Sequence, residues 1–254
     1  FYLTAQRLRS RRFAWLCAVL LAFNALTLLH TRRAMAESAL LFGLFVFFFA
    51  LTVRPSLRPF LLAAAAAFAL CAKQSTAPLI VAGAVVILLD PQLPWRRRLL
   101  SLAAFLAIIA LVFAALNPVF WGDPWQTANG SWRFRQDLVT IQRAQIQAIS
   151  PDLAINSYSD RVATMLAQLY FSIPAVADVA TYVRSTQAAS DLYFSNPLHL
   201  LFRGFPAGII FLTLSLFGLL LILHRIWKAG RPLASPLFWL IFTFAGLTGG
   251  LLVA

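Results

Sequence analysis

Long apolar runs separated by short basic connections constrain the fold of this chain more than any other feature. The runs at 13–29, 99–116 and 206–224 contain no Lys, Arg, Asp or Glu. About 20 apolar residues in a helix, at roughly 1.5 Å per residue, cross the hydrocarbon core of a membrane. The chain is 61% hydrophobic and only 11% charged, with a mean hydropathy of +0.81. No strand-like alternation repeats along it, so we predict an all-α fold, a polytopic transmembrane helical bundle.

The basic residues of the chain lie in four clusters, each in a short connection beside an apolar run. These clusters are at Arg7–Arg12, Arg54–Arg58, Arg96–Arg98 and Arg225–Arg231. Cytoplasmic connections of membrane proteins carry such an excess of Arg and Lys, so we assign all four to the cytoplasmic side. Seven of the eight acidic residues, all but Asp90, fall in segments left for the other side. The net charge of +13 is therefore a topology signal, and no nucleic-acid partner is expected.

The apolar run at 60–89 has two interpretations, because Lys73-Gln-Ser-Thr-Ala-Pro78 interrupts its middle. One kinked helix would place the basic connections before and after it on opposite sides of the membrane. Two short helices that meet at Lys73 keep both connections cytoplasmic, so we favour the hairpin, with Lys73 at the outer face. Together with runs at 38–53 and 236–254, this gives about seven spans.

The apolar runs divide the chain into three parts. We expect a transmembrane region at 1–116, an extracytoplasmic helical segment at 117–204 and C-terminal transmembrane helices at 205–254. Within the middle segment, helical spacing of apolar residues predicts a weakly amphipathic helix at 132–149. Ser157-Tyr-Ser-Asp160 resembles a capping box at the start of a further helix.

The ends of the chain and its composition carry three further expectations. Phe1-Tyr-Leu-Thr-Ala5 is typical of the last turn of a helix, and the sequence stops inside an apolar run, so we interpret the chain as a fragment of a multi-pass protein. A composition rich in Leu, Ala and Arg favours a bacterial inner membrane. Cys17 and Cys71 lie in apolar runs and are interpreted as buried thiols.

Three features on the predicted outer side carry the residues that we interpret as a binding site. They comprise the charged segment at 30–37, the polar break at 73–78 and the segment at 117–125, and their candidate residues are Arg32, Arg33, Glu37, Lys73, Trp121 and Asp123. Arg and Lys are the usual donors to phosphate groups. A nearby carboxylate orients a hydroxyl or sugar, or acts as a base.

Each candidate also has a structural interpretation. Arg32 and Arg33 can anchor a helix end at lipid head groups, and Glu37 can pair with one of them. Lys73 is harder to explain structurally, because a lysine at membrane depth is costly. Trp121 is typical of an interfacial aromatic belt, and Asp123 before a proline is typical of a turn. The three histidines lack metal-ligand spacing, so no metal site and no required cofactor is predicted, and a divalent metal stays an open question.

The order of three motifs resembles the polytopic glycosyltransferases of the GT-C type. The motifs are Arg32-Arg-Ala-Met-Ala-Glu-Ser-Ala-Leu-Leu-Phe42, Ala72-Lys-Gln-Ser-Thr-Ala-Pro78 and Asn117-Pro-Val-Phe-Trp-Gly-Asp-Pro124. They are most similar to the group of dolichyl-phosphate-mannose protein mannosyltransferases and aminoarabinose transferases. The resemblance covers about residues 1–125 and weakens after that.

The resemblance implies transfer of a sugar from a polyprenyl-phosphate donor to an extracytoplasmic protein, lipid or glycan acceptor. Its principal catalytic acid would precede Phe1, which leaves the activity of the fragment alone in question. Glu37 matches a second, supporting acid, Arg32 matches the arginine that precedes it, and Lys73 matches a lysine for the carrier phosphate. The alternative function is a transporter or flippase of a lipid-linked or anionic substrate, since it would share the cationic outer pocket.

Overall fold

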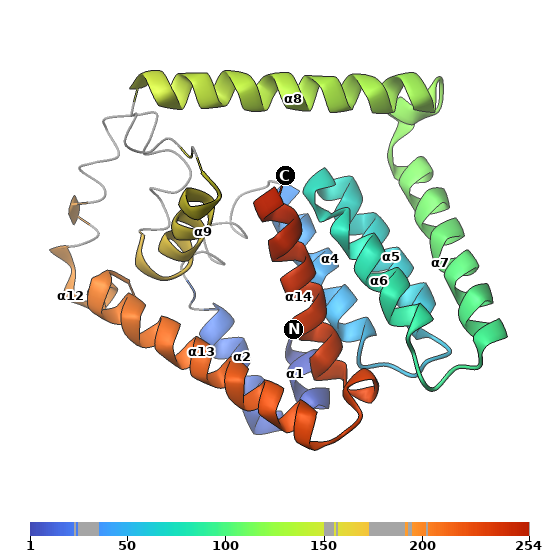
Figure 1. Cartoon of the computed structure of the whole chain (residues 1–254), viewed down its shortest axis with the longest axis horizontal. Helices are drawn as coiled ribbons and strands as arrows, with labels where there is room; N and C mark the ends of the chain where they lie inside the picture. Colours follow the sequence, from blue (N-terminus) through green and yellow to red (C-terminus); the bar gives the residue numbers. More distant parts are fainter. Residues whose placement is uncertain are drawn as a thin grey trace. The chain divides into compact units, whose positions relative to one another are not determined.

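The computed structural model describes residues 1–22, 24, 36–149, 155, 157–172, 191–192, 195–201 and 203–253. The chain forms two compact units: unit 1 comprises 1–121 and 222–254, and unit 2 comprises 122–221. The residues in these ranges form helices and their connections, without a β-strand (Figure 1). The prediction of an all-α fold is confirmed.

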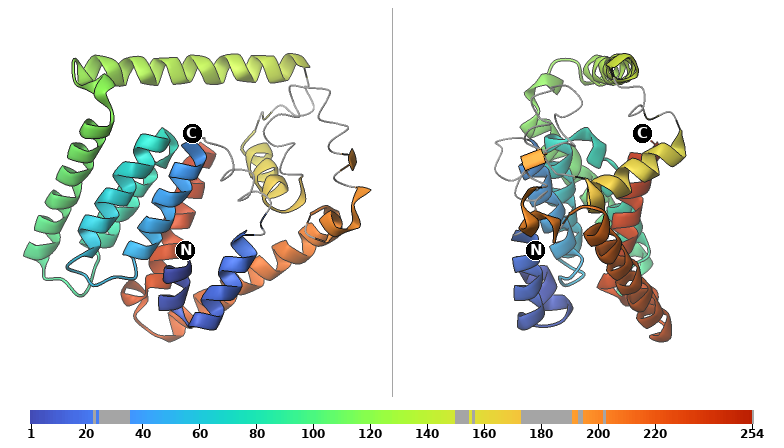
Figure 2. Two further views of the ribbon diagram at one scale, coloured as in Figure 1. Left: turned by 180° about the vertical axis from the view of Figure 1, so that it is seen from behind. Right: turned by 90° about the vertical axis from the view of Figure 1, so that its left-hand side faces the viewer.

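Unit 1 contains the N-terminal helices and the C-terminal helix. Its elements are α1 (Tyr2–Leu8), α2 (Arg11–Ala22), α4 (Ala36–Ala50), α5 (Arg58–Ala72), the 3₁₀ turn η1 (Gln74–Thr76), α6 (Pro78–Leu88), α7 (Trp95–Leu116), the 3₁₀ turn η2 (Pro118–Phe120), the last residues of α13 (Phe205–Lys228), the 3₁₀ turn η5 (Pro232–Ala234) and α14 (Pro236–Val253). Figures 1 and 2 show α4, α5, α6 and α14 side by side.

The run at 60–89 forms two helices, α5 and α6, as the hairpin interpretation predicts. Lys73 ends α5 in an extended conformation, with φ −157° and ψ 122°. Its carbonyl oxygen then accepts hydrogen bonds from the backbone N–H of Thr76 at 3.1 Å and from the Thr76 hydroxyl at 2.7 Å. Pro78 begins α6, where its missing N–H has no intrahelical partner to lose. The polar residues therefore reverse the chain within one tight turn.

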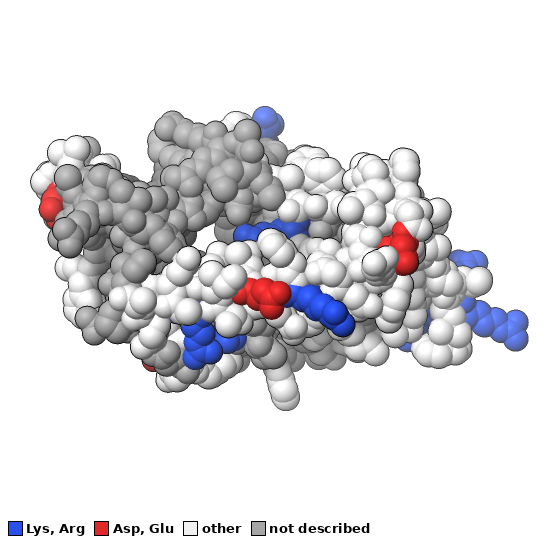
Figure 3. All heavy atoms as spheres, turned by 90° about the horizontal axis from the view of Figure 1, so that it is seen from above, with Lys and Arg blue, Asp and Glu red and all other residues white. Residues whose placement is uncertain are grey.

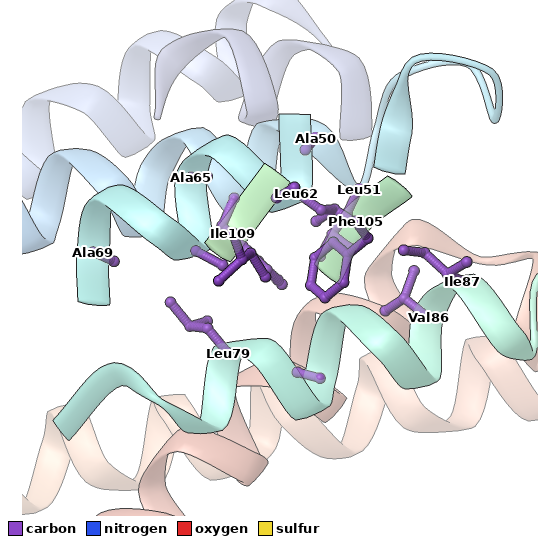
Figure 4. Packing of buried hydrophobic residues seen from close by; sticks show 14 of the residues in the cluster. Ala50, Leu51, Leu62, Ala65, Ala69, Leu79, Val86, Ile87, Phe105 and Ile109 are labelled. Carbon is purple, nitrogen blue, oxygen red and sulfur yellow. The ribbon is translucent and has the colours of Figure 1, made fainter. Parts of the chain in front are cut away.

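Alanines and glycines allow the helices of unit 1 to pack closely around large side chains. Phe47, Leu62 and Phe105 are fully buried, and Figure 4 shows the Phe105 ring from α7 among side chains of its neighbours. A Cβ atom on Gly83 of α6 would lie 2.6 Å from Cζ of Phe105. Burying one such aromatic side chain contributes about 1.5–3 kcal/mol. Gly83 thus makes the space that this ring occupies.

The four basic clusters lie at one end of unit 1. Arg7 donates to the carbonyl oxygen of Thr52 at 3.3 Å, which ties the first cluster to the connection after α4. Arg58 binds Asp90 at 2.6 Å, which ties that connection to the one after α6. A Cβ on Gly250 would lie 2.7 Å from Pro78, so α14 runs antiparallel to α6 and begins where α6 ends.

We call this the basic end, and the opposite end, which holds Lys73, the lysine end. The connections of the basic end lie along the lower edge of unit 1 in Figure 1. The hairpin interpretation predicts that the basic connections before α5 and after α6 lie at the same end, as they do here.

Unit 2 contains the long polar helix and the elements that follow it. They are α8 (Pro124–Ile149), α9 (Tyr158–Leu166), the π-helix η4 (Ala167–Phe171), α12 (Pro197–Leu200) and residues 205–221 of α13. The capping box is confirmed: the Asp160 N–H donates to the Ser157 hydroxyl at 3.1 Å, and the Ser157 N–H donates to Asp160 at 2.8 Å. Buried Arg203 donates to the carbonyl oxygen of Gln168 at 2.7 Å and to that of Ser172 at 3.3 Å.

Two predicted boundaries differ from the structure. The helix predicted at 132–149 begins eight residues earlier, at Pro124, because Asp123 caps it: the Gln126 N–H donates to Asp123 Oδ1 at 2.9 Å. Unit 2 begins at Gly122 and ends within α13, whereas the extracytoplasmic segment was predicted at 117–204. Its placement outside the membrane stays a prediction.

Within the described ranges, two helices are long and apolar enough to cross a membrane, α7 with 22 residues and α13 with 24. Four further apolar helices are shorter, at Ser38–Ala50, Arg58–Ala72, Gln74–Leu88 and Pro236–Gly250. A helix of 15 residues is about 22 Å long, below the roughly 30 Å of the hydrocarbon core. Helices therefore occur in the described parts of the predicted runs, whereas the end of the run at 13–29 lies outside the described residues. The count of about seven spans stays a prediction.

Candidate functional site

The lysine end of unit 1 brings together the ends of α4, α5 and α7. A Cβ on Gly43 of α4 would lie 2.9 Å from the Ala69 Cβ of α5, so the two helices touch there. Glu37 lies six residues before Gly43, and Lys73 lies four residues after Ala69. At about 1.5 Å per residue, both backbones continue to the same end, by about 9 Å and 6 Å. The first turn of α4 and the Lys73 turn therefore lie at similar levels.

Asn117 joins the end of α7 to the end of α5. Its Nδ2 donates to the carbonyl oxygen of Phe113 at 2.8 Å and lies 3.1 Å from Sγ of Cys71. Cys71 and Cys17 are both free thiols. No local sequence pattern predicts this contact, because the two residues are 46 positions apart. Asn117 thus positions α7 beside the Lys73 turn.

The exposed polar groups of the turn are Lys73 and Gln74, whereas Thr76 is buried and holds the turn closed. An ammonium group offers three donors and a compact positive charge, and a glutamine amide offers donors and an acceptor. Such a surface suits an anionic group, above all a phosphate. The turn can therefore hold the charged part of a ligand at this end of unit 1.

Trp121 follows α7 and belongs to unit 1. Its indole N–H donates to the carbonyl oxygen of Ala114 at 2.6 Å, and the side chain is 68% exposed. The hydrogen bond fixes the ring against the end of α7, and an interfacial position for it stays a prediction. A substrate contact for Trp121 stays a prediction.

The remaining predicted site residues are placed as follows. Asp123 belongs to unit 2, where its carboxylate caps α8, and its predicted role in binding substrate stays a prediction. Arg32 and Arg33 lie outside the described residues. Glu37 lies in the first turn of α4, and only its backbone is described.

The ion pair between Arg58 and Asp90 at the basic end of unit 1 was not predicted from the sequence. At the basic end, Arg58 Nη1 binds Asp90 Oδ2 at 2.6 Å, and Asp90 Oδ1 accepts the Gln92 N–H at 2.9 Å. Arg58 and Asp90 are only 12% and 3% exposed. Burial lowers the pKa of the Arg58 guanidinium, and the Asp90 carboxylate opposes this shift. The pair explains why Asp90 is the one acid among the basic connections.

Within the described residues, no three His, Cys, Asp or Glu side chains are arranged to hold a metal ion. No protein-family model matches the chain, and no curated protein or solved structure is significantly similar to it. The resemblance to GT-C glycosyltransferases therefore depends on the motifs quoted above.

Proposed function

We propose that the chain is the membrane-embedded part of a glycosyltransferase that moves a sugar from a polyprenyl-phosphate donor to an extracytoplasmic acceptor. The observation that carries this proposal is the α5–α6 hairpin. It brings Lys73 to the end of unit 1 that also holds the first turn of α4, with Glu37, and that lies opposite the basic end.

The exposure of apolar side chains supports the embedding of the chain in a membrane; the assignment to a bacterial inner membrane rests on composition alone. In the most apolar 18-residue windows of α7 and α13, only 11% of the residues are buried. The core helix of a water-soluble protein would be mostly buried instead. Leu100 and Leu111 of α7, for example, are 71% and 70% exposed. A contiguous apolar surface of this kind is expected to contact another apolar phase, and hydrocarbon is such a phase.

The charge distribution supports a multi-pass arrangement with alternating helix directions. All four basic clusters lie at one end, which the positive-inside rule assigns to the cytoplasm. The predicted seven spans follow from this assignment, provided that the shorter helices tilt little or thin the bilayer locally. Lys73 then faces the extracytoplasmic side.

The proposed reaction forms a bond between the acceptor oxygen and the anomeric carbon of the sugar, while the bond from that carbon to the phosphate oxygen breaks. A base accepts the proton of the acceptor hydroxyl, and the polyprenyl phosphate leaves as an anion. The resemblance assigns the role of principal base to an acid other than Glu37, and Glu37 would help to position sugar or acceptor. Lys73 and Arg32 would stabilise the charge on the departing phosphate, which is electrostatic catalysis.

The test measures sugar transfer from a polyprenyl-phosphate donor in membranes that contain the product of the whole open reading frame. We expect Lys73→Ala to lower the transfer rate by about 100-fold, the usual effect of losing one group that stabilises transition-state charge. Gln92→Ala, an exposed side chain just after the other end of α6, is the matched control and should retain most of the activity. Unchanged transfer by Lys73→Ala would remove Lys73 from the mechanism. Movement of the donor across the membrane without transfer would favour a transporter.

A further inference from the structure

The net positive charge of the chain belongs entirely to unit 1. Fifteen of the 21 Lys and Arg residues and two of the eight acidic residues lie in unit 1, which gives it a charge of +13. Unit 2 has six basic and six acidic residues and no net charge. Figure 3, which looks down on the side drawn uppermost in Figure 1, shows an acidic side chain directly beside a basic one near the centre of the view. The charge excess is therefore a property of one unit.

Most cations of the basic end are not used to hold the fold. Arg58 is paired with Asp90, Arg98 donates to the carbonyl oxygens of Leu93 and Leu88 at 2.7 Å and 3.0 Å, and Arg7 binds Thr52. The other basic side chains of this end are exposed: Arg9, Arg11, Arg12, Arg54, Arg96, Arg97, Arg225, Lys228 and Arg231. The only acid in the sequence at this end, Asp90, is already neutralised by Arg58.

Exposed tryptophans accompany these cations. Trp15, Trp95 and Trp227 are 58%, 60% and 84% exposed. Trp95 directly precedes Arg96, and Trp227 directly precedes Lys228. A tryptophan ring prefers the zone between hydrocarbon and head groups, because its body is apolar and its N–H is polar. Cations at the same level then meet the phosphates of the head groups.

From this arrangement we infer that the basic end of unit 1 is a binding surface for anionic phospholipid head groups. The inference rests on the membrane placement in the proposed function, and it concerns the end opposite Lys73. Anionic lipids of the cytoplasmic leaflet attract basic segments, by about five-fold in affinity per Lys or Arg. Nine exposed cations with one neutralised acid form a surface that binds acidic lipids in preference to zwitterionic ones.

The experiment uses the delipidated full chain in neutral detergent micelles. Phosphatidylglycerol or phosphatidylcholine is titrated in, and bound lipid is counted by native mass spectrometry at low and high salt. We expect at least a ten-fold preference for phosphatidylglycerol that falls as salt rises. Equal binding of the two lipids would overturn the inference. Tighter binding of soluble polyphosphate than of phosphatidylglycerol would also overturn it, in favour of a soluble anion.

Double variants distinguish lipid binding at the basic end from a general effect of the net charge of the chain. Arg96→Gln/Arg97→Gln removes two exposed cations beside Trp95 and should weaken binding of phosphatidylglycerol by about ten- to thirty-fold. Arg225→Gln/Lys228→Gln makes the same change on another helix, in case the first variant does not fold. Arg133→Gln/Arg143→Gln removes two exposed cations from α8 and should stay within two-fold of the unchanged protein. An equal loss in this control would contradict the inference. Because no sugar donor is present, the result is independent of the transfer assay.

Discussion

Replacing Asp90 should destabilise unit 1 more than any exposed charge change, because Asp90 neutralises a buried cation. The Arg58–Asp90 contact is 2.6 Å long, and both side chains are nearly covered. Removing one partner of such a pair costs about 3–5 kcal/mol, since the other charge stays buried without compensation. Arg58 keeps 12% exposure and its hydrogen bond to the carbonyl oxygen of Val53, so we expect the lower value, about 3 kcal/mol, for Asp90→Ala.

The destabilisation caused by Asp90→Ala should depend on the presence of Arg58. The double variant Arg58→Met/Asp90→Ala removes both charges and should be destabilised by only about 1 kcal/mol, because an apolar replacement of a buried pair is often close to neutral. The coupling between the two sites would then be about 2 kcal/mol or more. Arg54→Met is the matched control. It removes an exposed arginine from the same connection and should change stability by less than about 0.5 kcal/mol.

The measurement is the free energy of unfolding of the full chain in mixed micelles, from titration with sodium dodecyl sulfate followed by circular dichroism. If Asp90→Ala cost no more than the Arg54 control, the pair would not hold the two basic connections together. If the double variant lost as much as the sum of the single variants, the effect would be unrelated to the ion pair.

Three further changes test the packing and the caps. Gly83→Ala should cost about 1–3 kcal/mol, since its Cβ would meet the buried Phe105 ring at 2.6 Å. Gly218→Ala, which meets no atom within 4 Å, should be neutral or slightly stabilising in the same unfolding assay, and equal losses would contradict the packing. Ser157→Ala should cost about 1 kcal/mol and speed hydrogen exchange at the start of α9, whereas unchanged exchange would argue against the capping box. Asp123→Ala should likewise fray the first turn of α8, and Asp123→Asn, which keeps an acceptor, should restore it.

The sequence predicted the hairpin because two independent signals agreed. The polar residues at 73–78 marked a break, and the basic connections on either side required an even number of crossings. The structure joins those connections through Arg58 and Asp90. The pair itself was not predictable, because it depends on the relative register of two helix ends that lie 32 residues apart. Asp90 had only appeared as an exception to the charge rule.

Local sequence signals predicted the structure correctly where the residues of a single turn determine it, as in the capping box of Ser157 and Asp160. The start of α8 was predicted eight residues too late because the helical spacing of apolar residues begins only after residue 131, whereas the cap at Asp123 and the first-turn proline begin the helix before it. The candidate site was predicted only in outline. The level of Lys73 relative to α4 follows from the close contact of Gly43 with Ala69, which no local pattern encodes.

The two ends of α6 provide the most direct test of the proposed arrangement. Gln74 and Gln92 are both exposed and lie just before and just after this helix. Each is replaced by cysteine, as Gln74→Cys or Gln92→Cys, in a Cys17→Ser/Cys71→Ser background. Intact cells are then treated with a maleimide that does not cross membranes. We predict labelling of the Gln74→Cys protein in intact cells and of the Gln92→Cys protein only after lysis. Labelling of both from outside, or of Gln92→Cys alone, would contradict an extracytoplasmic Lys73 and with it the proposed function.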